Sequence, residues 1–471
     1  MRLLRRLALL STVLPAALGA QRRAPVPRTP IDWPAIEREG VALLRDYLRL
    51  NSTNPPGNEL AAAHFLRDFL AKQGIEAQIL DTAELGVGRA NLYARVKGDG
   101  SKRAIALVHH MDVVPATASS WTAPPFSGQI RDGFVYGRGA LDMKSEGIAQ
   151  LMAVVALKRG GVPLRRDLVI VANADEEWGS TGALTFADKH ADLLRDVEFL
   201  FTEGGSNSVR NDTLRFRGIG VSAKRTFWQR LTVRGIPSHG SRPTKNNPVP
   251  RLVAALDRLA KYETPLHATP GVDRYFRDIS RDYQGERKAW LEDVTRALED
   301  PRAREWILSD VYWNAILRNT ISITGLQGSN KTNVIPPEAS AEVDIRLLPD
   351  QDPDSMLATL RAVVADTAVR FTPLIVPKTP FESSTDTDFF RAVERASREH
   401  DPGAFVTSSM LTGATDRPMY RRLGIQVYGL DPFRTNDVDY QRGVHGNDER
   451  IGVVNFLSGV RFLYDVLRYV Q

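Results

Sequence analysis

Three consecutive acidic side chains, Asp175-Glu176-Glu177, follow the apolar run Asp167–Ala172. The run predicts a buried parallel strand, and the acids then lie just past its carboxyl end, where open α/β sheets bind their ligands. Adjacent carboxylates repel one another unless a positive charge lies among them. For this stretch taken alone, a helix amino-terminus, which also favours acids, is the alternative.

Other predicted elements carry a histidine or a carboxylate at one end. The apolar run Ala104–Val108 leads into His110 and Asp112, which alternation along a strand points to the same face. Asp112 is then placed to hold the ring of His110, as a metal-bound imidazole requires. A hydrogen-bonded core histidine is the alternative for His110. Asp142 precedes a predicted helix, where a helix cap is the alternative, and Val197–Thr202 is a buried strand that ends at an acid.

These element ends together favour a shared cation. An unpaired buried carboxylate is costly, and a cation held in common removes that cost. The chain contains no cysteine, so such a site is built from His, Asp and Glu alone. Imidazole with carboxylate suits Zn²⁺, with Co²⁺ or Mn²⁺ as alternatives.

The composition is that of an ordinary globular protein, with 42% hydrophobic and 25% charged residues. A length of 471 residues predicts more than one domain. The net charge of +6 is small, and no basic stripe with interleaved aromatic residues occurs. Nucleic acid is therefore not an expected partner.

Residues 1–20 have the pattern of a secretory signal peptide. Three arginines in the first six residues precede the apolar stretch Leu7–Ala20, and small residues allow cleavage after Gly19 or Ala20. The alternative is a membrane anchor, but a spanning helix needs about 20 apolar residues and this stretch is shorter. The sequence thus predicts export to the periplasm or the medium, with 21–34 as a linker and no membrane contact after cleavage.

The rest of the chain predicts an α/β domain interrupted by an α+β domain. Gly218–Ile236 alternates apolar and polar residues, which is typical of antiparallel strands and differs from the buried runs before it. We therefore predict a first catalytic part at 35–215, an inserted lid at 216–377 and a second catalytic part at 378–471. The expected catalytic sheet is mixed, mostly parallel and twisted.

Eight short motifs occur in order along the chain, and all eight together are specific. They are His110–Pro115, Gly137–Lys144, Asp175–Glu177, Thr202–Gly205, Ser238–Gly240, Asn333–Pro336, Val343–Arg346 and His445-Gly446. On these motifs the chain resembles the di-zinc metallopeptidase family of aminoacylase, acetylornithine deacetylase, succinyl-diaminopimelate desuccinylase and glutamate carboxypeptidase. The resemblance covers nearly all of the mature chain. The long helical insert in the lid looks most like the carboxypeptidase S branch.

The resemblance implies a zinc-exopeptidase fold and two zinc ions held by five side chains: His110, Asp142, Glu177, Glu203 and His445. It implies that Asp142 bridges both ions and that the peptide bond after it is cis. Asp112 would orient the ring of His110, and Glu176 would be the general base. Two ions about 3.5–4 Å apart can share a water molecule and lower its pKa.

Four further residues are implied to meet the substrate: His239, Asn333 and Arg346 from the lid, and Gly413 near the substrate carboxylate. A guanidinium such as Arg346 can grip a carboxylate bidentately, with a surface strand arginine as the alternative. An imidazole such as His239 can stabilise an oxyanion, with a turn residue as the alternative. In dimeric members His239 reaches the site of the partner subunit, which leaves a homodimer through the lid open.

The predicted function is metal-dependent hydrolysis of an amide bond next to a free carboxylate, by a dipeptidase, carboxypeptidase or other exopeptidase. An N-acyl-amino-acid amidohydrolase with the same machinery is the alternative, because the pocket for the acyl side falls on unassigned loops. The expected substrate is thus a small peptide or an N-acyl amino acid. A periplasmic binding protein without catalysis is a third hypothesis, which the intact base Glu176 disfavours.

Overall fold

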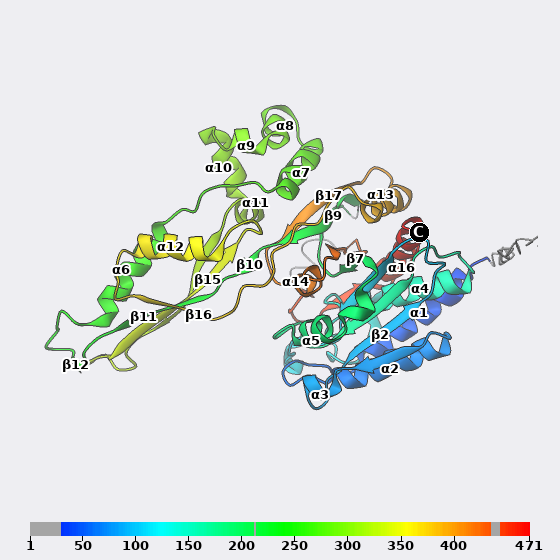
Figure 1. Ribbon diagram of the computed structural model, residues 1–471, viewed down its shortest axis with the longest axis horizontal. Coiled ribbons are helices and arrows are strands. Elements are labelled where there is room, and N and C mark those ends of the chain that lie inside the picture. Colours follow the sequence, from blue (N-terminus) through cyan, green and yellow to red (C-terminus); the bar gives the residue numbers. More distant parts are fainter. Residues whose placement is uncertain (1–29, 212, 435–442) are drawn as a thin grey trace, which may run out of the picture.

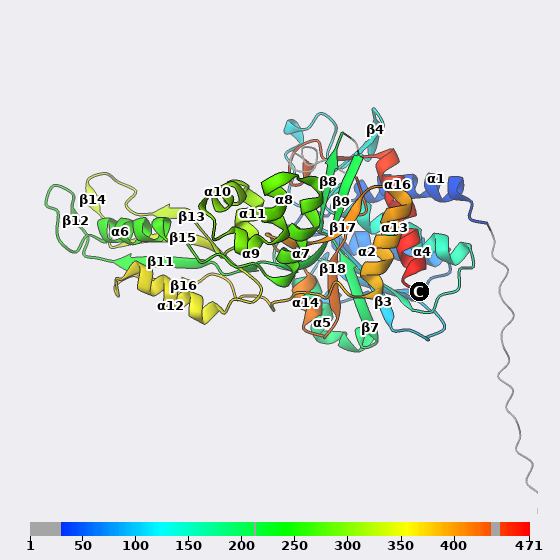
Figure 2. The ribbon, with the colours of Figure 1, turned by 90° about the horizontal axis from the view of Figure 1, so that it is seen from above.

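The computed structural model describes residues 30–211, 213–434 and 443–471. The predicted signal peptide lies outside the described residues, as does most of the predicted linker. Figures 1 and 2 show a broad body, built around a large sheet, from which a long arm extends. We call this arm the lid; it comprises a second sheet and the two helices packed on it.

The body contains a nine-stranded sheet. Eight strands follow one another in the order β1-β2-β6-β3-β7-β18-β9-β17, and β8 pairs with β9. The central strands β6, β3, β7 and β18 are parallel, and antiparallel pairs flank them, which confirms the predicted mixed α/β fold. The strands are β1 (Ala77–Leu80), β2 (Asn91–Val96), β3 (Ala104–His110), β6 (Leu168–Asn173), β7 (Val197–Thr202), β8 (Ser206–Arg210), β9 (Thr213–Ala223), β17 (Phe405–Leu411) and β18 (Gln426–Gly429).

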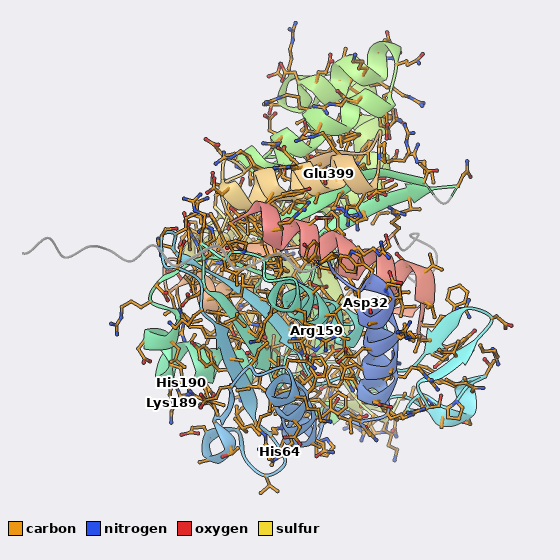
Figure 3. All side chains as sticks on the ribbon, turned by 90° about the vertical axis from the view of Figure 1, so that its right-hand side faces the viewer. Asp32, His64, Arg159, Lys189, His190 and Glu399 are labelled. Carbon is orange, nitrogen blue, oxygen red and sulfur yellow. The ribbon has the colours of Figure 1, made fainter. Side chains whose placement is uncertain are left out.

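Helices cover both faces of this sheet because the strand residues are apolar on both faces. Along β6, Leu168 and Ile170 join one hydrophobic core, while Val169 and Val171 join another. The first core is closed by α1 (Trp33–Leu48), α2 (Glu59–Lys72), α4 (Lys144–Arg159), α13 (Asp388–His400) and α16 (Val453–Tyr469). The second is closed by α5 (Thr181–Lys189) and α14 (Arg417–Arg421). Figure 3 labels Asp32 and Arg159 at helix ends of the first layer, and Lys189 and His190 at the end of α5.

Short elements complete the body. A three-stranded sheet joins β19 (Arg450–Gly452), β5 (Phe134–Tyr136) and β4 (Gln129–Arg131), so that the chain near its end pairs with the segment before α4. The remaining short helices are α3 (Thr82–Leu85) and the 3-10 turns Ala118–Ser120, Ala191–Leu194 and Ser280–Asp282.

The lid is built on a five-stranded antiparallel sheet with its own apolar core. Its strands are β10 (Arg225–Thr226), β11 (Gln229–Arg234), β13 (Thr320–Gln327), β15 (Glu338–Leu347) and β16 (Arg370–Pro373). The helices α6 (Pro248–Lys261) and α12 (Pro353–Val364) pack on it. A small pair, β12 (Ser238–His239) with β14 (Val334–Ile335), forms its tip, which lies far from the large sheet in Figures 1 and 2.

A block of five short helices lies within the inserted stretch but contacts the body. The helices are α7 (Pro270–Ile279), α8 (Gly285–Glu292), α9 (Val294–Ala297), α10 (Pro301–Ser309) and α11 (Val311–Ile316). The hydroxyl of Tyr312 donates to the carbonyl of Met410 at 3.0 Å, and that of Ser408 donates to the carbonyl of Gly271 at 2.7 Å. Both acceptor–donor pairs join the block to strand β17.

The change from one sheet to the other falls later than the expected boundary at residue 216. Strand β9 crosses that position and pairs in parallel with β17 in the large sheet. Its alternation resembled a lid strand, but β9 is covered by helices on both faces. Only Lys224 separates β9 from β10. Its Nζ donates to the carbonyls of Ala315 and Arg318 and to the hydroxyl of Thr320.

Candidate active site

The side chains of His110, Asp142 and Glu203 meet at the carboxyl edge of the large sheet. Because β3 and β7 are parallel, His110 at the end of β3 and Glu203 just after β7 reach the same edge. Asp142 precedes α4. The Nε2 atom of His110 lies 3.0 Å from Oδ1 of Asp142 and 3.6 Å from Oε2 of Glu203.

A second imidazole meets the other oxygen of Asp142. The Nε2 atom of His445 lies 3.3 Å from Oδ2 of Asp142 and 3.1 Å from Oε2 of Glu177. Asp142 therefore lies between the two histidines and offers one carboxylate oxygen to each. The peptide bond Asp142–Met143 is cis, as the resemblance implied. All five residues predicted as metal ligands thus gather around one carboxylate.

The electrostatics of this cluster call for positive charge. Burial opposes charging of His110, but hydrogen bonds with Asp112, Asp142 and Glu203 outweigh it and raise its pKa well above the ordinary range. Hydrogen bonds with Asp142 and Glu177 raise the pKa of His445 to about 10. The clustered carboxylates favour positive charge, which protonated imidazoles provide here and which bound cations would also provide.

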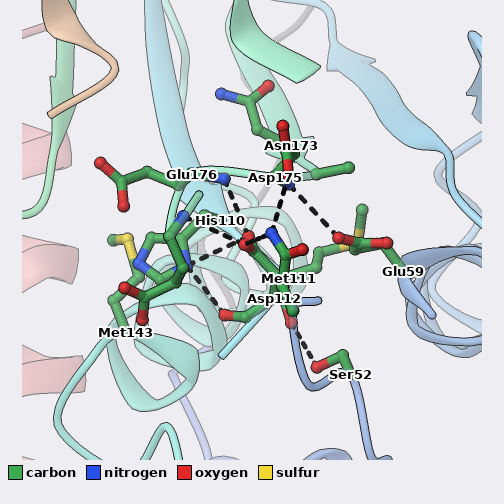
Figure 4. A network of polar contacts seen from close by, with 12 residues as sticks. Ser52, Glu59, His110, Met111, Asp112, Met143, Asn173, Asp175 and Glu176 are labelled. Atoms are coloured by element: carbon green, nitrogen blue, oxygen red, sulfur yellow. Dashed lines mark hydrogen bonds and ion pairs between the residues drawn. The ribbon is translucent and has the colours of Figure 1, made fainter. Parts of the chain in front are cut away.

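The carboxylate of Asp112 organises the segment that carries the acidic pair (Figure 4). Its Oδ1 accepts the backbone N–H of Glu176, and its Oδ2 accepts that of Glu177, both at 3.1 Å. The Nδ1 atom of His110 lies 2.9 Å from the backbone carbonyl of Asp112 and 3.6 Å from its carboxylate. In the neutral imidazole that binds a metal, donation of the Nδ1 proton to that carbonyl would leave the lone pair of Nε2 facing the cluster.

Residues that the sequence did not single out support Asp112. The amide of Asn54 donates to Oδ2 of Asp112 and to Oδ1 of Asp175, both at 2.8 Å. Arg89 donates to the same oxygen of Asp175 at 2.6 Å. Asp175 also accepts from the backbone N–H and the hydroxyl of Thr181 at the start of α5. Asn54 lies in a polar loop, and only its burial beside two carboxylates shows that it supports the site.

Among the described residues, Glu176 is the acid beside the cluster that forms no ion pair with His110 or His445. Ligand atoms of His110, Glu176 and Glu203 lie within 4.8 Å of one another, as do those of His110, Asp142 and Glu177. Burial and the neighbouring charge of Glu203 raise the pKa of Glu176 well above the ordinary value. A carboxyl group with a raised pKa can exchange a proton near neutral pH.

The residues present fit a pair of divalent cations. Among the described residues, the buried Oε1 atom of Glu177 has no hydrogen-bond partner. A buried carboxylate oxygen without a partner is costly unless a cation binds it. The donor set of two imidazole nitrogens and carboxylate oxygens is the set that zinc and related metals bind.

Two of the predicted lid residues lie together, away from this cluster. His239 belongs to β12, which lies at the tip of the lid far from the large sheet (Figure 1). Asn333 precedes β14, and its carbonyl accepts the backbone N–H of Gly240 at 2.7 Å. The two residues are thus neighbours, but within one chain the structure does not bring them to His110.

The other two predicted substrate residues lie where the lid joins the body. Arg346 on β15 pairs with Thr226 on β10, and Gly413 follows β17, whose Leu411 accepts the backbone N–H of Lys224. The guanidinium of Arg346 donates to both carboxylate oxygens of Asp344, at 2.7 and 3.1 Å. A substrate carboxylate would have to compete with Asp344, which the sequence did not predict.

The fold and this cluster define a metallopeptidase. Residues 106–469 match the sequence profile of Peptidase family M20/M25/M40, and the chain belongs to this family. This confirms the resemblance drawn from the eight motifs. The chain is accordingly a metal-dependent hydrolase of amide bonds, in the class that holds both peptidases and N-acyl-amino-acid amidohydrolases.

Several known proteins are similar to this chain over most of its length. It is 29% identical over 387 residues to human N-fatty-acyl-amino acid synthase/hydrolase PM20D1, covering 80% of this chain and 76% of that protein. It is 26% identical over 382 residues to probable carboxypeptidase S-like 2 of Dictyostelium discoideum, covering 79% and 73%. The crystal structure of the M20 family metallo-carboxypeptidase Sso-CP2 from Sulfolobus solfataricus shares the fold, with a TM-score of 0.71 and 19% identity over 92% of this chain and 99% of that one.

Proposed function

We propose that the chain is a di-zinc exopeptidase that hydrolyses an amide bond beside a free carboxylate. His110, Asp142 and Glu203 would hold one ion, and His445, Asp142 and Glu177 the other. Two bound zinc ions supply an activated water and polarise the scissile carbonyl. The observation that carries the proposal is the position of Asp142, with one oxygen facing each imidazole.

Glu176 is the general base in this proposal. Adjacent residues cannot both face one point, so Glu177 turns its Oε2 to His445 while Glu176 stays on the side of Glu203. Glu176 takes a proton from water and later returns it to the leaving nitrogen. Its raised pKa suits both steps, because the carboxyl must hold the proton between them.

Recognition of the substrate is assigned to the junction of body and lid. Arg346 lies near the end of β15, where it pairs with Thr226 of β10, the short lid strand that follows the crossing from the body, and its planar guanidinium suits a carboxylate. Gly413 lies in a loop that begins beside this crossing. In the free protein Asp344 keeps the guanidinium paired and oriented, and the substrate carboxylate would replace one of its bonds.

His239 and Asn333 are proposed to act in the site of a partner subunit. Their place at the tip of the lid supports this, since a tip that points away from its own large sheet is free to reach another. A homodimer joined through its lids would then complete two sites, with His239 of the partner subunit stabilising the oxyanion.

A second candidate is hydrolysis of N-acyl amino acids. Its specific support is the similarity to the human relative, which is named an N-fatty-acyl-amino acid synthase/hydrolase. The test is a panel of dipeptides and of N-acyl amino acids with short and long acyl chains, assayed on protein of measured metal content. Turnover of dipeptides alone supports the exopeptidase, and turnover of acyl substrates alone supports the second candidate. A protein loaded with two zinc ions that hydrolyses neither class would refute both.

We also propose that the protein is exported, on the strength of residues 1–20. Expression with and without these residues, followed by fractionation and mass measurement, tests it. A mature amino-terminus at Ala20 or Gln21 is expected in the exported fraction. Retention of the full chain in the cytoplasm would overturn it.

A further inference from the structure

A buried carboxylate, that of Glu449, lies behind the cluster and belongs to none of the assigned roles. Its side chain has no exposed surface. Its Oε1 accepts the backbone N–H groups of Leu141 and Asp142, at 2.7 and 3.1 Å. Its Oε2 accepts that of Gly139 at 2.9 Å. One carboxylate thus fixes the turn that ends at Asp142.

The same carboxylate reaches the loop of His445 through an arginine. The Nη1 atom of Arg138 donates to Oε2 of Glu449 at 2.6 Å. Its Nη2 atom donates to the carbonyl of Gly446 at 2.7 Å. Arg138 is itself buried, and its guanidinium packs over the ring of Trp121. Arg138 therefore joins the residue after His445 to the group that holds Asp142.

The backbone of His445 needs such a support. Its φ of +58° is in the left-handed region, which a residue with a side chain occupies at a cost and keeps only when its surroundings fix it. Next to it, the backbone N–H of Gly446 donates to the carbonyl of Gly443, and Arg138 donates to the carbonyl of Gly446. Loss of the second bond removes one of these two supports from the backbone that places His445 beside Asp142.

We propose that Glu449 and Arg138 are positioning residues that set the distance between Asp142 and His445, and hence the affinity of the metal site that these two residues share with Glu177. This inference rests on the proposed di-metal function. The site of His110 and Glu203 depends on it less, because those side chains come from the ends of β3 and β7. Groups that orient metal ligands in this way change metal affinity about 10- to 100-fold when they are replaced.

Two variants remove the coupling in different ways. In Glu449→Gln the amide offers one acceptor oxygen and places a donor against the N–H groups that Glu449 satisfies. In Arg138→Lys those three bonds to Glu449 remain, but a single ammonium cannot reach both Glu449 and the carbonyl of Gly446. The second variant keeps the buried charge and tests the coupling even if the first does not fold.

Glu198→Gln is the matched control. Glu198 also pairs with a buried arginine, Arg166, at 2.5 Å, but it lies at the start of β7, whereas Glu203 follows the end of that strand. Its replacement removes a charged partner of a buried arginine, at a carboxylate that is 34% exposed, without touching the segments of Asp142 or His445. A general loss of stability would appear in all three variants.

The experiment is titration of the metal-free, full mature chain with Co²⁺, followed by calorimetry and by the visible spectrum of the bound ion. We expect two equivalents in the wild type and in Glu198→Gln. In Arg138→Lys, which keeps the bonds from Glu449 to the segment of Asp142, we expect one equivalent of unchanged affinity and a second weakened at least 10-fold. In Glu449→Gln, which also disturbs that segment, we expect both equivalents to weaken and the second to weaken more. Two equivalents of wild-type affinity in folded Arg138→Lys, or equal weakening in Glu198→Gln, would overturn the inference. A wild type that binds no Co²⁺ tightly would instead refute the proposed function itself.

Discussion

The imidazole of His445 meets the carboxylate of Glu177, with Nε2 3.1 Å from Oε2, although the two residues come from distant parts of the chain. Glu177 follows a strand of the large sheet, and His445 lies in a loop shortly before the last helix. Their meeting brings the two ends of the catalytic body together at one point. Chemistry at this site therefore requires that the whole body is folded.

Replacement of the base tests the division of labour between the adjacent acids. Glu176→Gln should lower kcat about 10²- to 10⁴-fold, because it removes proton transfer. Metal content should stay at the wild-type value, because Glu177 and not Glu176 faces His445. Steady-state kinetics and metal analysis on one sample check this. A variant with full metal content and unchanged kcat would exclude Glu176 as base.

Removal of metal should abolish activity. Excess chelator followed by desalting is expected to leave no turnover, and added Zn²⁺ or Co²⁺ should restore it, because in the proposed mechanism the bound ions supply the activated water. Circular dichroism before and after chelation shows whether the fold survives. Persistent turnover by protein shown to be free of metal would rule out the mechanism.

Mixed subunits test whether His239 acts in the site of a partner. His239→Ala and Glu176→Gln should each be inactive alone. In a mixed dimer, the subunit with intact Glu176 receives His239 of the partner subunit, so random mixing should restore about a quarter of wild-type activity. Native mass spectrometry verifies the mixed species. Confirmed mixed dimers without activity would reject action between subunits.

The pairing of Arg346 with Asp344 predicts opposite effects of two substitutions. Arg346→Lys should raise KM about 10-fold or more for substrates with a free carboxylate, because an ammonium cannot make the bidentate contact. Asp344→Asn should lower KM, because it removes the competing carboxylate. The matched control is the same substrate with its carboxylate amidated, for which neither variant should change KM. An equal effect on both substrates would contradict the assignment.

Asp167 predicts an acid-dependent loss of stability. Burial opposes its ionisation, but Arg95 and Lys97 outweigh it and lower its pKa. A lowered folded-state pKa contributes stability above the unfolded value of about 4, and this contribution is lost as the pH falls through the folded value. Asp167→Asn should therefore cost about 1–2 kcal/mol at pH 7 and less at pH 3. Urea unfolding of the metal-free protein at both values measures it, and a cost that does not depend on pH would contradict it.

Local patterns predicted much of the body. The predicted buried strand Val197–Thr202 has the bounds of β7, the apolar run Ala104–Val108 lies within β3, and the acids of the motifs lie at one sheet edge as expected. The boundary at 216 was wrong because alternation along β9 does not distinguish a half-exposed lid strand from a strand between two helix layers. The alternation of apolar and polar residues along a strand does not by itself show what covers each face of that strand.

The residues that support the site from distant parts of the chain could not be predicted from the sequence, for a different reason. Asn54, Arg89 and Glu449 stand in polar loops where their residue types are ordinary, and their importance comes from which backbone groups they meet. The competition between Asp344 and a substrate for Arg346 likewise appears only when the side chains are placed. Sequence motifs identify the metal ligands, but the groups that orient those ligands can be identified only from the three-dimensional structure.

The single residue between β9 and β10 lies at the crossing from the body to the lid. The ammonium of Lys224 donates to three oxygens at the end of the helical block, and Arg346 lies close to it, paired with Thr226 of β10. A lid that turned at this crossing would move Arg346 little and His239, at the tip, the most. The side chain assigned to the substrate carboxylate would then stay in place while the tip travels.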